Sequence, residues 1–128
     1  MTADAFADLL YGDDGNDTIE GGAYEDTIFD GAGNDRLIGG SQDDLLYGGE
    51  GDDYIASTSD NATIFGGDGN DTIHAQYGGA FVDAGAGDDQ IFLAAIRARR
   101  STSPTAMARA PTTCRISTRI STICIWAT

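Results

Sequence analysis

The chain has 128 residues, with 21 acidic against 7 basic residues, 18 glycines and only 2 prolines, and its formal net charge is −14. So acidic a chain repels phosphate backbones, and we expect no nucleic-acid partner. It contains no run of apolar residues long enough to cross a bilayer, and its N-terminus lacks the basic and apolar regions of a signal peptide, so we expect no membrane span.

The charge is divided unevenly along the chain. All the acidic residues lie between Asp4 and Asp89, where Arg36 is the only base, so residues 1–95 carry 1 − 21 = −20. Residues 96–128 contain six arginines and no acidic residue, which makes this part +6. The two parts therefore differ in kind, and we divide the chain into residues 3–92 and 93–128.

A nine-residue repeat fills residues 3–92. Every ninth residue from Leu10 to Ile91 is aliphatic, and the residue two places before it is aspartate in eight of the ten units. The clearest unit, residues 66–74, reads GGDGNDTIH. Glycines at the first, second and fourth places predict a tight turn with positive φ angles. The last three residues predict a short strand whose aliphatic middle residue points inward.

This pattern resembles the RTX (repeats-in-toxin) calcium-binding nonapeptide, G-G-x-G-x-D-x-U-x. The resemblance implies an all-β fold, a parallel β-roll or calcium-binding β-solenoid, in which two nonapeptides make one coil and calcium lies between successive coils. Ten units would then form about five coils. With about 4.8 Å between neighbouring strands, the stack would be about 24 Å long.

Alternate units fall on opposite sides of such a roll, and the two sides differ. On the first side the fourth place is always glycine and the sixth is always aspartate. These aspartates are Asp17, Asp35, Asp53, Asp71 and Asp89. On the second side the aspartates are Asp8, Asp26 and Asp44, and the next two units have Ala62 and Ala80 instead. The fourth places of the second side hold Phe6, Tyr24, Gln42, Asp60 and Gly78.

We expect about four calcium sites on the first side, between the aspartate pairs 17/35, 35/53, 53/71 and 71/89. On the second side we expect at most two poorer sites, 8/26 and 26/44, because a bulky fourth residue resists the glycine backbone geometry.

Calcium suits these aspartates because it is a hard cation that takes six to eight oxygen ligands, which carboxylates and turn carbonyls supply. The alternative role of each aspartate is to satisfy its own turn backbone. A stacked column of carboxylates repels itself, however, and this favours a bound cation. We therefore predict seven calcium ligands: Asp17, Asp35, Asp53, Asp71, Asp89, Asp26 and Asp44.

One aliphatic residue per unit is a small core for about 90 ordered residues, so we expect calcium to decide whether the array folds. The resemblance implies export of the unfolded chain by type I secretion. We predict a calcium-binding module of a secreted RTX protein that folds outside the cell. The alternative is the remnant of an RTX enzyme or pore-forming toxin whose effector domain is absent from this chain. The only histidine, His74, occupies an outward ninth place, and we expect no enzymatic activity.

Residues 93–128 break the repeat, because Arg100, Arg109 and Thr118 stand where aliphatic residues are due. We expect this tail to be irregular or disordered and not to continue the roll. Its Ser, Thr, Ala and Arg content is typical of GC-rich DNA read out of frame, and residues 105–114 can be back-translated so that another frame encodes the repeat unit GDGEGADDL. The alternative is a genuine basic tail that caps the last coil or binds a partner, with Ile123, Ile125 and Trp126 as contact residues.

Overall fold

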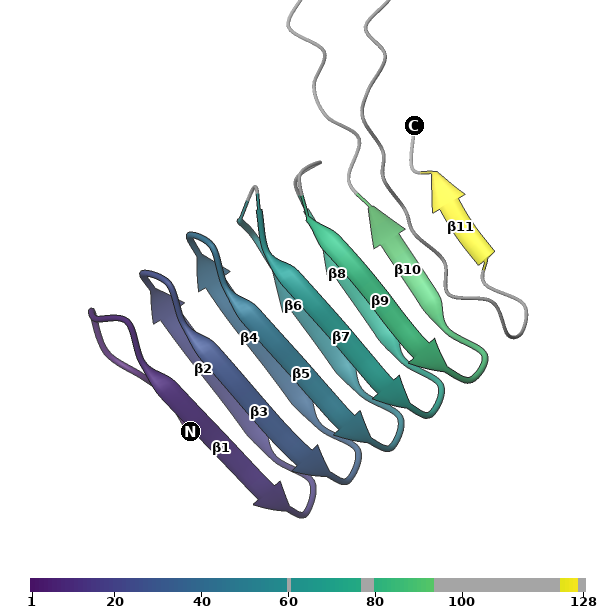
Figure 1. The fold of residues 1–128 in the computed structure, drawn as a ribbon, viewed down its shortest axis with the longest axis horizontal. Helices are drawn as coiled ribbons and strands as arrows, with labels where there is room; N and C mark the ends of the chain where they lie inside the picture. Colours follow the sequence, from purple (N-terminus) through teal and green to yellow (C-terminus); the bar gives the residue numbers. More distant parts are fainter. Residues whose placement is uncertain (60, 77–79, 94–122, 127–128) are drawn as a thin grey trace, which may run out of the picture.

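The repeat region folds into a parallel β-solenoid built from two sheets (Figure 1). The computed structural model describes residues 1–59, 61–76, 80–93 and 123–126. The predicted all-β roll is confirmed. In this described part of the chain, no helix has the length and apolar character needed to cross a membrane.

Strands alternate between the two sheets along the chain. The first sheet contains β1 (Leu9–Asp14), β3 (Thr27–Ala32), β5 (Leu45–Glu50), β7 (Thr63–Asp68) and β9 (Phe81–Ala86). The second contains β2 (Thr18–Ala23), β4 (Arg36–Ser41), β6 (Tyr54–Ser57), β8 (Thr72–Ala75), β10 (Gln90–Leu93) and β11 (Ile123–Trp126).

Each residue pairs with its equivalent one coil later. Leu10 lies opposite Ile28, and Ile28 lies opposite Leu46, so the register advances by two nonapeptide units. From β1 to β10 the two sheets each contribute five strands, joined by four coil-to-coil steps. The nine-residue period specifies this register, because a slip by one residue would turn every aliphatic side chain outward.

The core is a stack of aliphatic side chains between the two sheets. The repeated aliphatic residues from Ile19 to Ile91 are all buried, most of them completely, whereas Leu10 at the N-terminal end is only partly buried. Leu10 differs because no coil precedes β1 in the described residues. The row is therefore continuous along the roll and open to solvent at its first coil.

The strands are longer than the three residues predicted from each unit, because most of them continue through the glycines that follow. Positive φ angles occur at the second and fourth places, as at Gly49 (119°) and Gly51 (123°). The prediction that first-place glycines also adopt positive φ is wrong: Gly48 and its equivalents do not.

Two bulky fourth-place residues adopt the glycine-like conformation. Tyr24 has φ 86° and Gln42 has φ 83°, so the expectation that bulk prevents this turn is wrong for these two units. The turn is set by its neighbours in the stack, and the strain costs about 1–3 kcal/mol per residue. Asp60 and Gly78, the other fourth-place residues considered, lie outside the described residues.

Aromatic side chains form a row on the outer face of the first sheet. Tyr11, Phe29, Tyr47 and Phe65 are stacked in order, with ring centroids 5.5, 4.7 and 4.7 Å apart. On the second sheet, the outward His74 stacks on Phe92 at 4.5 Å and is only half-buried. These contacts follow from the parallel register, which places equivalent side chains one strand spacing apart.

Four residues of the tail belong to the roll. Strand β11 pairs in parallel with β10 and extends the second sheet by one strand. The expectation that residues 96–128 do not continue the roll is therefore wrong for Ile123–Trp126. These residue types favour strands, and the edge of β10 offers unpaired backbone groups. The other tail residues considered, 94–122 and 127–128, lie outside the described residues.

Candidate metal centre

Two rows of aspartates line the turns that enter the strands. We call Asp17, Asp35, Asp53, Asp71 and Asp89 the first row, and Asp8, Asp26 and Asp44 the second row. Six of these carboxylates are at most 4% exposed, and only Asp8 and Asp17, at the N-terminal end, are half-buried. Burial of so many carboxylates in described turns needs compensation, because an ionised group loses its hydration there.

One oxygen of each carboxylate is used to join neighbouring coils. The backbone N–H of Asp35 donates to Oδ1 of Asp53 at 2.9 Å, and the N–H of Asp53 donates to Oδ1 of Asp71 at 2.9 Å. The same bond recurs with 18-residue spacing through both rows. The sixth-place aspartate therefore has a structural role between coils in addition to any role as a ligand.

The other carboxylate oxygen is left without a hydrogen-bond partner. The affected buried atoms in these rows are Oδ2 of Asp8, Asp26, Asp35, Asp44, Asp53 and Asp71. An unsatisfied buried carboxylate oxygen is costly, so its regular recurrence at the same place of each turn indicates a missing electrostatic partner.

First-place glycines leave open space in front of these oxygens. A Cβ atom at Gly21 would lie 2.5 Å from Oδ2 of Asp26 and 2.7 Å from the carbonyl oxygen of Gly39, which belongs to the next coil. Gly48 is placed in the same way against Asp53 and the Gly66 carbonyl. Glycine is required here for space, not for a positive φ, and the space is lined by a carboxylate oxygen and a carbonyl oxygen.

This donor set fits calcium. Carboxylate and carbonyl oxygens are the ligands that hard cations prefer, and they come here from two successive coils. A cation bound at such a place would pair with the unsatisfied oxygens and would hold the coils together. The second row offers the same arrangement at Asp26 and Asp44 as the first row does at Asp53 and Asp71, so these second-row places are built equally well.

The pKa values of the carboxylates report the electrostatic cost of the rows. Burial raises the pKa of Asp71 to about 7 and those of Asp44 and Asp53 to about 6. Neighbouring carboxylates raise these pKa values further, while the hydrogen bond from the preceding coil opposes the rise. Burial also raises the pKa of Asp89. The rows therefore favour uptake of positive charge, either protons or a metal ion.

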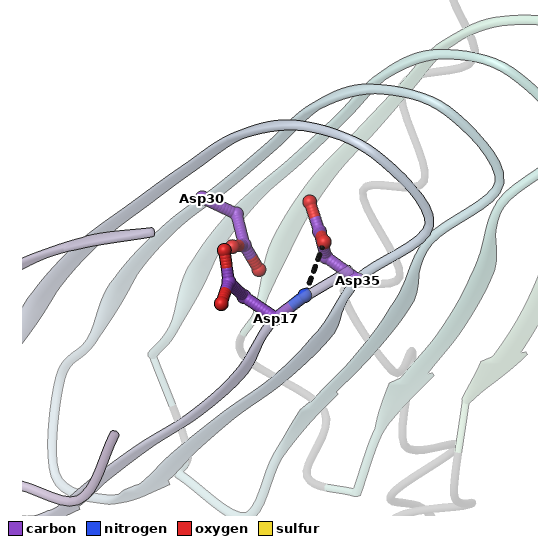
Figure 2. A group of neighbouring side chains, drawn as sticks. All are labelled: Asp17, Asp30 and Asp35. Carbon is purple, nitrogen blue, oxygen red and sulfur yellow. Dashed lines mark hydrogen bonds between the residues drawn. The ribbon is translucent and has the colours of Figure 1, made fainter. Parts of the chain in front are cut away.

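The structure places the predicted ligands in the two rows as expected, and it adds one residue that the repeat pattern did not suggest. Asp30 is 1% exposed, and Figure 2 shows its carboxylate beside those of Asp17 and Asp35. Burial, followed by the charges of Asp35, Asp53 and Asp17, raises the pKa of Asp30 to about 7. The available signal was its position, because Asp30 is the only acidic residue at a first place of the repeat.

Fifth-place side chains form a further ladder that sequence reasoning missed. The N–H of Asp52 donates to Oδ1 of Asn34 at 3.1 Å, and the N–H of Asn70 donates to Oδ1 of Asp52 at 2.8 Å. These residues lie in the exposed part of the turns. Their bonds hold the turns of successive coils in line without occupying the space next to the first-place glycines.

Comparison with known families agrees with this geometry. A family model described as RTX calcium-binding nonapeptide repeat (4 copies) matches residues 1–23, 20–55 and 57–91, which is more than half of the chain. No curated protein and no solved structure matches the chain.

Proposed function

This chain belongs to the family of RTX calcium-binding nonapeptide repeats, and from this premise we propose that it is a calcium-binding module that folds when calcium binds outside the cell. The observation that carries the proposal is the recurrence of one unsatisfied, buried Oδ2 atom in successive turns. A bound calcium ion would supply the positive charge that these oxygens lack.

Coupling of binding to folding is supported by the way each site is divided between two coils. The carboxylate of Asp53 comes from one turn, and the carbonyl oxygen of Gly66 comes from the turn 18 residues later. Neither coil has both groups in position unless the stack forms, so the binding free energy is also folding free energy. The sharing of contacts between neighbouring coils makes this folding cooperative.

A secreted location follows from the same coupling. Extracellular calcium modules bind with dissociation constants of about 10⁻⁴–10⁻³ M, which leaves them ion-free in calcium-poor cytosol. In that state the repeat region carries a charge of −20 from residues 1–95 and opposes its own compaction. We propose that the chain crosses the export machinery of its cell unfolded and becomes ordered on the calcium-rich side.

We also propose that this module has no catalytic activity of its own and serves an effector domain of the parent protein. The acidic side chains gathered in its described turns are ligands for a cation, and they repeat identically from coil to coil, whereas an active site needs one asymmetric group of residues.

The test compares Asp53→Asn with Asp52→Asn in the full chain. Both substitutions remove one negative charge from the same turn, but Asp53 is buried with a free Oδ2, whereas Asp52 is exposed and uses Oδ1 as an acceptor. We expect the natural chain to gain β-structure on calcium addition, measured by circular dichroism. Asp53→Asn should lower the calcium stoichiometry in calorimetry, and Asp52→Asn should leave it unchanged.

Identical spectra of the natural chain with calcium and with chelator would refute calcium-coupled folding. Equal loss of calcium in both variants would refute the assignment of Asp53 as a ligand, because the effect would then come from overall charge alone.

A further inference from the structure

Asp30 is an acidic side chain at a place where the repeat normally has glycine. It lies in β3 and is 1% exposed, and neither of its carboxylate oxygens has a hydrogen-bond partner. At the equivalent places one coil earlier and one coil later the chain has Gly12 and Gly48. The sixth-place aspartates use Oδ1 between coils, whereas Asp30 forms no such bond among the described residues.

The carboxylate of Asp30 lies between two members of the first row. Ligand oxygens of Asp17, Asp30 and Asp35 all lie within 4.8 Å of one another (Figure 2). Asp35 accepts the backbone N–H of Asp17 at 2.8 Å through Oδ1, while its buried Oδ2 is unpartnered. Three carboxylates thus converge from two successive coils, and two of them contribute buried oxygens without any donor.

The backbone leaves room for these groups on the side of the first coil. A Cβ atom at Gly12 would collide with Oδ1 of Asp30, and it would lie 2.7 Å from the carbonyl oxygen of Asp30 and 3.3 Å from Oδ2 of Asp17. Oxygen atoms from both coils therefore surround the space beside Gly12. The nearby base in sequence, Arg36, is directed elsewhere, with its guanidinium 5.2 Å from the ring centre of Tyr54.

We propose that Asp17, Asp30 and Asp35 form a three-carboxylate cation site that binds calcium more tightly than the other turns do. This inference rests on the proposed function, and it adds Asp30 as a ligand outside the repeat pattern. The affinity of calcium sites rises with the number of charged ligands, so a third carboxylate distinguishes this junction from those beside Gly48 and Gly66.

The magnitude follows from charge. A third carboxylate adds one attraction to a divalent ion at ligand distance, and this attraction exceeds the added repulsion from two carboxylates that lie farther away. We expect the site to bind calcium about tenfold more tightly than the remaining sites. A trivalent lanthanide of similar ligand preference should favour this site more strongly still, because the attraction grows with the charge of the ion.

The experiment uses the full chain and two substitutions of the same residue. Asp30→Asn keeps the size of the side chain and removes its charge, while Asp30→Gly restores the residue that the repeat has at this place. Asp14→Asn is the matched control, because Asp14 is an exposed acidic residue of the neighbouring turn outside the cluster. Calcium alone is titrated by calorimetry, and terbium competes for the calcium-loaded chain.

We expect both Asp30 variants to lose the tightest class of calcium binding and the preference for terbium, while calcium still induces their folding. Asp14→Asn should behave like the natural chain. An extra calcium ion bound by Asp30→Gly would overturn the proposal, since Asp30 would then be occupying the place of an ion. Unchanged tight binding in Asp30→Asn would also overturn it. Failure of the natural chain itself to bind calcium would instead refute the proposed function, and the Asp30 site with it.

Discussion

Replacement of Gly51 by alanine tests how closely successive coils are packed, when compared with the same change at Gly15. Both residues are fourth-place glycines of the first side, with φ angles of 123° and 136°. Both donate their backbone N–H to a carbonyl oxygen of the next coil, at 2.7 and 2.8 Å. They differ in what lies behind them. A Cβ atom at Gly51 would strike the carbonyl group of Gly33, whereas at Gly15 it would meet only Oδ2 of Asp17 at 3.8 Å.

The two variants therefore share one energetic cost and differ in another. Alanine at either position adopts an unfavourable φ, which costs about 1–3 kcal/mol. Only Gly51→Ala also forces two coils apart, and overpacking of this kind costs about 1–3 kcal/mol more. In a domain of this size each kcal/mol lowers the melting temperature by about 4–8 °C. We expect Gly51→Ala to melt roughly 5–20 °C below Gly15→Ala.

Thermal unfolding followed by circular dichroism at saturating calcium measures this difference. Saturation is needed so that both variants start from the folded roll. Equal melting temperatures for the two variants would refute the close approach of coils at Gly51, and with it the explanation of why the fourth place is glycine throughout the first side.

Two further predictions concern pH and the tail. In calcium-free buffer the roll should be more stable at pH 4.5 than at pH 7.5, because the pKa values of Asp30 and Asp71 rise to about 7 in the fold from 3.8, so protonation favours the folded state and its benefit is lost as the pH rises through 7; lower β-content at pH 4.5, measured by circular dichroism, would contradict this. Deletion of residues 96–128 should leave calcium-induced folding intact and improve solubility, because only the four residues of β11 pair with the roll; loss of folding in the shortened chain would identify the tail as an essential cap.

Much of the site was accessible from the repeat alone. Asp53 and Asp71 were predicted as ligands from their place in the unit, and the structure puts both in one buried row with a free Oδ2. The prediction succeeded because a solenoid places each residue next to its own equivalents. Position within the unit therefore carries three-dimensional information that a non-repetitive chain would not have.

Other features of the turns needed the structure. The conformation of Tyr24 was judged from the usual preference for glycine, but stacking on neighbouring coils overrides that preference. Asp30 departs from the repeat, and comparison of units shows only that it is exceptional. Whether its carboxylate turns outward to water or inward to Asp17 depends on the backbone at that point and on the space beside Gly12.

The sequence by itself determined the period, the parallel register and the aliphatic interior of this protein, because the 18-residue coil leaves one arrangement in which every ninth residue from Leu10 to Ile91 is inward. Only the tertiary structure decided which oxygens meet. The unsatisfied Oδ2 of Asp53 and the carbonyl of Gly66 are brought together by the path of two different turns. Ligand geometry is a property of that path, since a cation responds to the distances between oxygens and not to their order along the chain.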